Sequence, residues 1–181
     1  MQTDLLRPLT ADDLEMVRTW RNSAAVAQYM YTDTPVSTEQ QQAWFTRISL
    51  DISKEYWIIS YQNRPVGVAN LYAINPDARS CYWAFYLGDE NLRGSGIGAK
   101  VEMAVLEYVF EVRKLNKLLC EVFVSNDKVI AMHEKFGFRR ESYFRQHIYK
   151  NGVFQDVVGL ALLQREWQQL REPLKAKFLR L

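Results

Sequence analysis

The chain has 181 residues, of which 48% are hydrophobic and 24% charged, and its formal net charge at pH 7 is +2. This length suits a single domain that needs neither disulfides nor metal to fold, and the composition excludes disordered and collagen-like chains. The net charge is too small to argue for nucleic-acid binding.

The first part of the chain predicts two helices. Thr10 supplies a hydroxyl cap and acidic residues follow it, so we expect a helix up to Asn22. Ser37 and Gln40 fit the capping-box pattern at the start of a second helix. An aromatic loop, residues 29–35, separates the two. The apolar face of the second helix would consist of Trp44, Phe45, Ile48 and Ile52.

After these helices the spacing of apolar residues becomes that of β-strands. β-branched and aromatic residues dominate three segments, which we expect to pair as neighbours. These strands cover residues 56–61, 66–74 and 80–88. An apolar stripe then predicts a helix over 97–113, and a shorter helix over 126–136 ends at Gly137. Further strands are expected over 118–124, 138–149 and 153–163.

The C-terminal segments complete one mixed domain. Residues 150–152, Lys-Asn-Gly, are a strong hairpin signal between the last two strands. From Gln164 the chain is expected to be helical until Pro173 and then to become a basic tail. We therefore predict one domain, residues 1–172, and a tail, residues 173–181. The order of elements indicates an α/β (α+β) fold in which helices flank one sheet.

The cysteines and the N-terminus indicate which covalent links, metal sites and cellular location to expect. Cys81 and Cys120 are the two cysteines, which are too few for a disulfide framework. No CxxC or CxxH spacing occurs, so we expect no metal site. The N-terminus is acidic where a signal peptide would be basic, and no apolar run reaches about 18 residues. These features predict a cytoplasmic protein without a membrane partner.

The segment with the clearest chemistry is Arg93-Gly94-Ser95-Gly96-Ile97-Gly98, which follows a strand and enters a helix. Its glycines let several backbone N–H groups face one spot, where the helix start and Arg93 add positive charge. Such a loop suits a diphosphate. It lacks the spacing of dinucleotide folds and of the P-loop, and a plain glycine-rich turn is the alternative.

A second motif follows in the next helix, with Asn126 and then His133-Glu134-Lys135-Phe136-Gly137-Phe138. Together the two motifs resemble the GNAT superfamily of acyl-CoA N-acyltransferases, over essentially the whole chain. The resemblance implies a mixed, mostly antiparallel, splayed sheet and acetyl-CoA as acyl donor. It implies a cofactor site formed by Phe85, Tyr86, Leu87, Arg93, Gly94, Ser95, Gly96, Ile97, Gly98, Ala99 and Asn126. Lys128 and Lys135 could reach the 3′-phosphate, although exposed helix lysines are more often only solvated.

Acetyl transfer needs a neutral amine, a stabilised oxyanion and a proton for the departing thiolate. His133 stands where many family members have a Tyr general acid; a surface or helix-capping histidine is the alternative. Glu121, flanked by apolar residues on its strand, is the candidate base; an ion pair with Lys or Arg is the alternative. Asp33 is a second candidate base. Neither cysteine has a base beside it in sequence, so we expect direct attack without an acyl-enzyme.

The two ends of the chain carry a closer likeness. Residues 20–22, 29–33 and the last hairpin are similar to GNAT enzymes of pseudaminic acid biosynthesis, which acetylate the 4-amino group of a UDP-linked 4-amino-4,6-dideoxy sugar. Members of this group often have His where this chain has Gln41. The likeness implies an acceptor site whose aromatic side chains stack on uracil or sugar. The residues of this site would be Arg21, Tyr29, Met30, Tyr31 and Asp33.

Other functions stay open. The acceptor could instead be a protein N-terminus, as in RimJ/RimL-like enzymes, or a polyamine. A polyamine site would favour an acidic cleft, and the N-terminal half has no acidic cluster beyond Asp12, Asp13 and Glu15. A non-catalytic acyl-CoA-binding module would predict a broken glycine loop or no donor at position 133. We expect a small-molecule partner and no nucleic acid, and a homodimer is compatible with the sequence.

Overall fold

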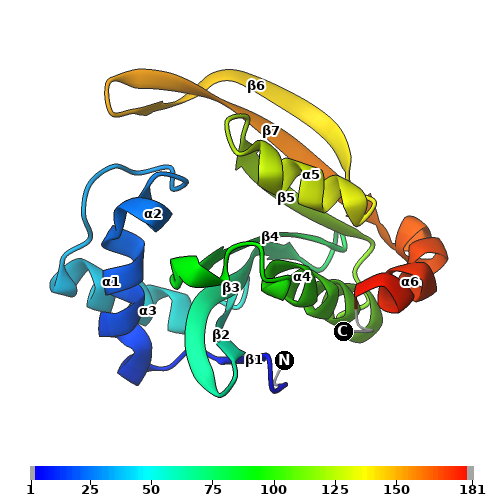
Figure 1. Ribbon diagram of the computed structural model, residues 1–181, viewed down its shortest axis with the longest axis horizontal. Coiled ribbons are helices and arrows are strands. Elements are labelled where there is room, and N and C mark those ends of the chain that lie inside the picture. Colours follow the sequence, from blue (N-terminus) through cyan, green and yellow to red (C-terminus); the bar gives the residue numbers. More distant parts are fainter. Residues whose placement is uncertain (1–2, 179–181) are drawn as a thin grey trace.

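The computed structural model describes residues 3–178, which form six helices and seven strands (Figure 1). The helices are α1 (Leu14–Asn22), α2 (Ala24–Ala27), α3 (Thr38–Leu50), α4 (Ile97–Glu107), α5 (Asp127–Lys135) and α6 (Gln164–Phe178). The strands are β1 (Leu6–Pro8), β2 (Glu55–Tyr61), β3 (Arg64–Asn75), β4 (Ser80–Leu87), β5 (Lys117–Phe123), β6 (Arg139–Lys150) and β7 (Val153–Leu163). A π-helical turn, Tyr108–Val112, continues α4.

All strands belong to one sheet with the order β1-β2-β3-β4-β5-β7-β6. Every neighbouring pair is antiparallel except β4 and β5, which run parallel and pair only as far as Tyr82 and Leu119. Beyond this point β4 continues beside β3 alone, and β5 beside β7 alone. We call these diverging segments, 83–87 and 120–123, the β4–β5 split. The predicted mixed, mostly antiparallel, splayed sheet is therefore confirmed.

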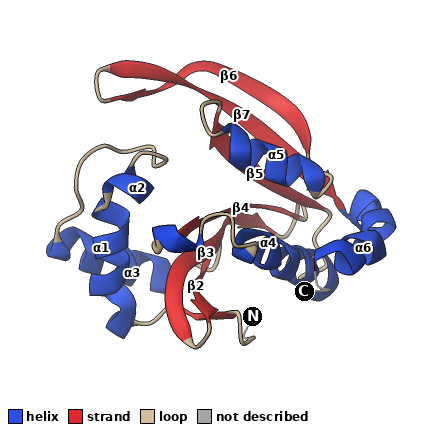
Figure 2. Cartoon of the chain, viewed as in Figure 1, coloured by secondary structure: helices blue, strands red, loops and turns tan. Residues whose placement is uncertain are grey.

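Helices cover both faces of the sheet, as Figure 2 shows. On one face Val17 of α1 packs on Ile58 and Val68 of the central strands. On the other face the larger core brings together α4, α5 and α6 with the strands, and Trp167 of α6 is fully buried there. Side chains alternate along a strand, so neighbouring residues of β5 point to opposite faces of the sheet. Glu121 lies on the face that α1 covers, and Cys120 lies in the larger core on the other face.

Several local predictions are confirmed. The N–H of Gln40 donates to the Ser37 hydroxyl at 3.2 Å, and the Ser37 N–H donates to the Gln40 side chain at 2.9 Å, which completes the capping box of α3. The turn between β6 and β7 has φ angles of 48° at Asn151 and 78° at Gly152, as a two-residue hairpin requires. Gly137, with φ 94°, follows α5 as predicted.

Other predictions were wrong or incomplete. The short elements β1 and α2 were not predicted. Ile52 lies beyond the end of α3 and is 95% exposed, so it takes no part in an apolar face. Pro173 does not end α6, which continues to Phe178. Leu174 packs in the core and Lys175 lies 3.0 Å from Glu107, and these contacts offset the backbone hydrogen bond that proline removes. Residues 179–181 of the predicted tail lie outside the described residues.

Within residues 3–178, none of the helices is both long and apolar enough to pass through a lipid bilayer. The same part of the chain brings together no group of three or more His, Cys, Asp or Glu side chains that could hold a metal ion.

Candidate active site

The loop between β4 and α4 offers a set of free backbone donors. Across the described residues, the N–H groups of Gly94 and Gly96 in the loop, and those of Gly98 and Ala99 in the first turn of α4, have no protein acceptor. Gly94 and Gly96 have φ angles of +82° and +85°, and a side chain at either position would enter open space. Gly96 directly precedes the first residue of α4. The loop thus presents its N–H groups and the positive end of a helix dipole to a ligand, which is the arrangement that a diphosphate requires.

The other residues of this loop have different tasks. The Ser95 hydroxyl donates to the carbonyl of Leu92 at 2.7 Å and therefore braces the loop itself. The Ile97 side chain is buried in the core, where it anchors the start of α4. The guanidinium of Arg93 donates to the carbonyl of Ala25 in α2 at 2.9 Å. Ser95 and Ile97 thus shape the predicted cofactor site, and Arg93 ties it to the N-terminal helices.

The remaining predicted cofactor residues border the same space. The β5-facing edge of β4 has no ladder partner beyond Tyr82, so its backbone can pair with an extended, amide-bearing ligand. Phe85 approaches Gly98 closely, since a Cβ there would lie 3.5 Å from the ring. Leu87 packs on the core of the α4 side, whereas Tyr86 packs on the α1 side. Asn126 precedes the first residue of α5 and makes no side-chain cap of that helix.

Two exposed lysines on α5, Lys128 and Lys135, form no ion pair with any residue from 3 to 178. Their separation of seven places them on one face of the helix. Both can therefore serve an anionic group of a ligand without losing an existing partner.

The predicted base lies on the opposite side of the sheet. The Tyr31 hydroxyl donates to Oε2 of Glu121 at 2.9 Å, and the Tyr31 ring packs 5.3 Å from that of Phe123. Burial, and next the negative charge of Glu121, raise the pKa of Tyr31. In the described part of the chain no Lys or Arg pairs with Glu121. The carboxylate is therefore bound to a neutral phenol and not to a cation, in contrast to the ion-pair alternative.

Arg21 also lies on the α1 side of the sheet, and no carboxylate from residues 3–178 pairs with its positive charge. Its guanidinium donates to the Thr32 hydroxyl at 2.6 Å. The side chain is half-buried, and across residues 3–178 it forms no ion pair with a carboxylate. Burial lowers the pKa of Arg21, and Tyr86 beside it acts in the opposite direction. A partly desolvated positive charge of this kind suits an anionic ligand.

The Tyr29–Asp33 loop is held by the far hairpin. The carboxylate of Asp33 accepts the backbone N–H of Asn151 at 3.1 Å, and this bond lowers the pKa of Asp33. A carboxylate that is stabilised in its charged form is a weaker base, so this contact favours a role of Asp33 in holding the loop over its predicted role as a second candidate base. Tyr29 is 42% exposed, while the carbonyl of Met30 is engaged by the same hairpin.

Lys150 at the end of β6 makes a second contact between the hairpin and the N-terminal segment, and sequence reasoning missed this residue. Its Nζ donates to the carbonyls of Ala27, Gln28 and Met30 at 2.5, 3.1 and 2.6 Å. The residue is only 6% exposed. All three protons of the ammonium are therefore used, and they close the C-terminal end of α2. The only signal in the sequence was a hairpin turn, which says nothing about carbonyls 120 residues away.

Replacing Lys150 with Met should lower the free energy of unfolding by about 2–4 kcal/mol, because three carbonyls lose a charged donor. Chemical denaturation followed by circular dichroism measures this change. The control is Lys114→Met, since Lys114 is 69% exposed and lies 3.9 Å from Glu111. That variant should differ from the parent by less than about 0.5 kcal/mol. An equally small change for Lys150→Met would contradict the role assigned to this ammonium.

His133 is neither a surface nor a helix-capping residue. The ring is 3% exposed, and its Nδ1 lies 2.8 Å from Oε1 of Glu102 in α4. Burial alone would lower the pKa of His133, but Glu102 and Cys120 outweigh it and raise that pKa to about 10. Sequence reasoning missed Glu102 as the partner of His133, although a glutamate within the apolar stripe of α4 was a signal. A proton donor at this position has to act from inside the protein.

Comparison with known proteins gives consistent matches. A sequence model of the acetyltransferase (GNAT) domain matches residues 5–139. Spermidine N(1)-acetyltransferase of Vibrio cholerae is 24% identical over 163 residues, which cover 90% of this chain and 94% of that protein. Acetyltransferase PseH of Campylobacter jejuni is 26% identical over 130 residues, which cover 72% of this chain and 79% of that protein. The crystal structure of the Vibrio cholerae spermidine N-acetyltransferase with CoA and spermine superposes with a TM-score of 0.84 at 23% identity, covering 92% of this chain and 99% of that one.

Proposed function

This chain belongs to the GNAT acetyltransferase family and is an N-acetyltransferase that uses acetyl-CoA, and we propose that its acceptor is an amino sugar carried on a nucleoside diphosphate. A UDP-linked 4-amino-4,6-dideoxy sugar is the specific candidate. The observation that carries the proposal is Arg21, a half-buried cation without a carboxylate partner across residues 3–178. A diphosphate supplies the missing negative charge.

A second cation supports an anionic acceptor. Lys150 lies close enough to Arg21 that, after burial, the guanidinium is the main cause lowering the pKa of Lys150. Asp33 is the neighbouring carboxylate that acts in the opposite direction. Arg21, Lys150 and Asp33 together carry one net positive charge, and Glu121 lies farther along at the β4–β5 split. The similarity to PseH agrees with this assignment over 72% of the chain.

The catalytic and binding roles are divided among separate residues in this proposal. The glycine loop with Arg93 binds the pyrophosphate of acetyl-CoA, and Lys128 and Lys135 bind its 3′-phosphate. Glu121 accepts the proton that the attacking amine loses, and the Tyr31 hydroxyl holds that carboxylate in place. The aromatic ring of Tyr29, which is 42% exposed, is available to stack on the base or sugar.

A polyamine is the second candidate acceptor, and the relatives support it more strongly. The similarity to spermidine N(1)-acetyltransferase covers 90% of the chain, compared with 72% for PseH. Glu121 would then attract the cationic amine, while Arg21 and Lys150 would repel it. The two candidates therefore make opposite predictions for the removal of Arg21.

A thiol-release assay across UDP-amino sugars, polyamines and N-terminal peptides identifies the acceptor. For a UDP-amino sugar, Arg21→Ala should raise the KM of the acceptor at least about 10-fold, because a charge-assisted hydrogen bond contributes about 1.5–3 kcal/mol. The KM of acetyl-CoA should stay unchanged. The control is Arg47→Ala on the exposed side of α3, which should leave both constants unchanged. Turnover of polyamines alone, with an unchanged or lower KM in Arg21→Ala, would replace the first candidate by the second.

A further inference from the structure

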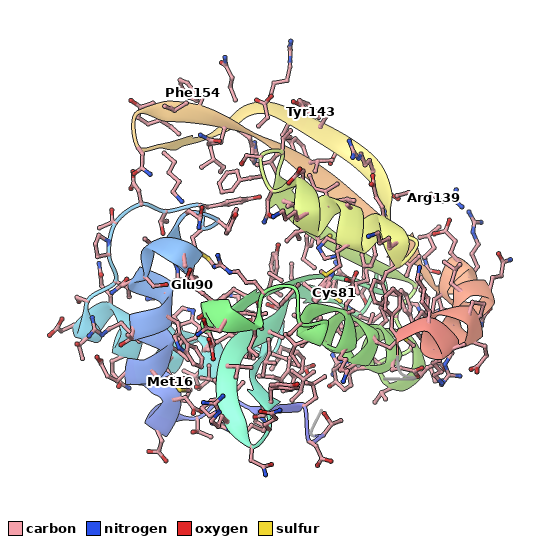
Figure 3. The ribbon with its side chains drawn as sticks, in the orientation of Figure 1. Met16, Cys81, Glu90, Arg139, Tyr143 and Phe154 are labelled. Carbon is pink, nitrogen blue, oxygen red and sulfur yellow. The ribbon has the colours of Figure 1, made fainter. Side chains whose placement is uncertain are left out.

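A buried pair of titratable side chains joins α4 to α5 beside the β4–β5 split. Nδ1 of His133 lies 2.8 Å from Oε1 of Glu102, and the exposed fractions of these two residues are 3% and 0%. The centre of the His133 ring lies 5.3 Å from that of Trp83, the first residue of β4 beyond its last pair with β5. Figure 3 labels Cys81, two residues before Trp83, which marks this region. A direct contact therefore places the pair where the two strands separate.

A row of contacts leads from the glycine loop to this pair. A Cβ at Gly98 would lie 3.5 Å from the ring of Phe85. That ring stacks on Trp83, with 5.5 Å between the centroids and 11° between the planes, and Trp83 in turn contacts His133. The row follows β4 where its edge has no ladder partner, and such an edge suits the amides of a pantetheine arm. An arm that starts from a diphosphate at the loop therefore leads toward His133.

The contact with Glu102 decides which nitrogen of His133 is free. A histidine ring has two nitrogens, and the hydrogen bond at one of them determines the proton that the other carries. Nδ1 is engaged by Glu102, whereas Nε2 makes no hydrogen bond to any residue from 3 to 178. Nε2 is also not among the unpartnered polar atoms of these residues that are sealed from solvent. This nitrogen therefore opens to accessible space, where it can meet a ligand.

Glu102 is difficult to explain as packing alone. Its side chain is fully buried, yet Oε2 is one of three buried side-chain polar atoms that lack a partner in the described part of the chain. Buried groups without a partner are rare and costly, and a buried ion pair contributes little net stability. Within residues 3–178 the hydrogen bond that this side chain makes is the one to His133. The function of Glu102 therefore lies in its effect on that ring.

We propose that Glu102 is a positioning residue, which holds Nδ1 of His133 so that Nε2 gives its proton to the departing CoA thiolate. The inference rests on the proposed transfer of an acetyl group from acetyl-CoA to an amine, and it deepens that function. His133 is the catalytic residue in this step, because its Nε2 contacts the leaving sulfur. Glu102 touches neither substrate and acts through the ring.

The protons balance over one turnover. The amine nitrogen bonds to the acyl carbon and loses a proton to Glu121, which passes it to water. The bond between the acyl carbon and sulfur breaks, and the CoA thiolate takes the proton of Nε2. The ring of His133 is then neutral and keeps its Nδ1 proton toward Glu102, and water returns a proton to Nε2. No acyl-enzyme is formed, and transfer to a neutral amine neither consumes nor releases a proton overall.

The surroundings of the ring give this step a defined pH dependence. Burial alone would lower the pKa of His133, but Glu102 from α4 and Cys120 from β5 raise that pKa to about 10. Trp83 and Phe138, whose rings also contact His133, carry no charge. Without the carboxylate, burial dominates and the pKa of His133 falls. Because the donor has to be protonated, the decline of kcat at alkaline pH should then begin at a lower pH.

Nitrogen NMR of the histidine rings tests the contact with CoA without any acceptor. The chain has two histidines, His133 and the exposed His147, so His147→Gln assigns the spectrum. Saturating CoA should move the Nε2 signal of His133 and leave the signals of His147 unchanged. An unmoved His133 signal in protein that binds CoA by calorimetry would overturn the proposal. This measurement needs no variant of the buried pair and does not depend on whether such variants fold.

Kinetics with whichever acceptor is turned over test the positioning role. Glu102→Gln should lower kcat about 10- to 100-fold at constant KM of acetyl-CoA, and should move the alkaline limb of the kcat profile down by at least about one pH unit. In a His133→Ala background the same change should have no further effect on kcat, because Glu102 acts through that ring. A purely structural role would not produce these results.

The matched control is Glu107→Gln on the same helix, which loses its ion pair with Arg171 at 2.8 Å. It should keep the parental kcat and pH profile. A parental pH profile in folded Glu102→Gln, or the same loss of kcat with and without His133, would overturn the positioning role. Failure of all UDP-amino sugars as substrates, with the CoA-dependent NMR shift intact, would count only against the proposed acceptor.

Discussion

Replacing Gly96 with Trp should lower the affinity for CoA at least about 100-fold, because the loop would lose several N–H contacts, each contributing about 1 kcal/mol or more. Gly96 has a φ of +85° and nothing within 4 Å of its missing Cβ, so an indole would fill the space next to the free donors. A non-glycine residue at this φ also adds strain of about 1–2 kcal/mol. Isothermal titration with CoA measures the loss, and circular dichroism checks that the fold is retained.

Gly152 offers a control with the same backbone conformation. It has a φ of +78° and, like Gly96, nothing within 4 Å of its missing Cβ, but it lies at the tip of the β6–β7 hairpin. Gly152→Trp carries the same strain and the same added ring, and it should leave CoA affinity unchanged. Equal affinities of the parent and Gly96→Trp would show that the loop does not bind the pyrophosphate.

Replacing Glu121 with Gln should lower kcat about 100-fold or more, since general-base catalysis contributes about 10²–10⁴-fold. The amide preserves the shape of the side chain and still accepts the hydrogen bond of Tyr31, so a structural role would cost little. Thiol release measured with saturating acetyl-CoA and acceptor gives the rate. The affinity for CoA should not change, because Glu121 lies on the α1 side of the sheet.

The matched control is Glu172→Gln, at a residue that is 76% exposed and 3.5 Å from Lys175 on α6. It should retain the parental rate. A rate near that of the parent in Glu121→Gln would assign the base to water or to another group. Tyr31→Phe should give an intermediate loss, because it leaves the carboxylate in place but removes the hydroxyl that orients it.

Local signals in the sequence predicted most of the fold. The capping box at Ser37, the glycine stop at Gly137 and the Asn-Gly hairpin each depend on residues within a few positions, and all three are present. The resemblance to GNAT enzymes supplied the splay of the sheet, which no local pattern contains. The prediction that Pro173 ends the last helix was wrong. The usual helix-breaking effect of proline is outweighed by contacts of α6 with Glu107, which is distant in sequence.

The site was less predictable, because its contacts join distant segments. Glu121 was chosen from strand alternation, but its partner Tyr31 is 90 residues away. His133 was chosen from its motif position, and its burial depends on Glu102, a partner 31 residues earlier. Asp33 was named as a second candidate base, and its hydrogen bond from the N–H of Asn151 could not be read from either segment. Residue type alone identified which groups could carry chemistry, and the fold decided which of them are free to do so.

The short helix α2 has a consequence for protein engineering. Four residues are too few for a helix that is stable in isolation, so its position depends on the two cations at its carbonyls, Arg93 at Ala25 and Lys150 at Ala27. One cation comes from the glycine-rich loop before α4 and the other from the distant β6–β7 hairpin. A chimaera that grafts only residues 24–33 onto another acetyltransferase would lack Arg93 and Lys150. The grafted segment would therefore not keep the conformation it has here. With the acceptor site proposed above, acceptor preference would depend on all three segments, and a recombination library would have to exchange them together.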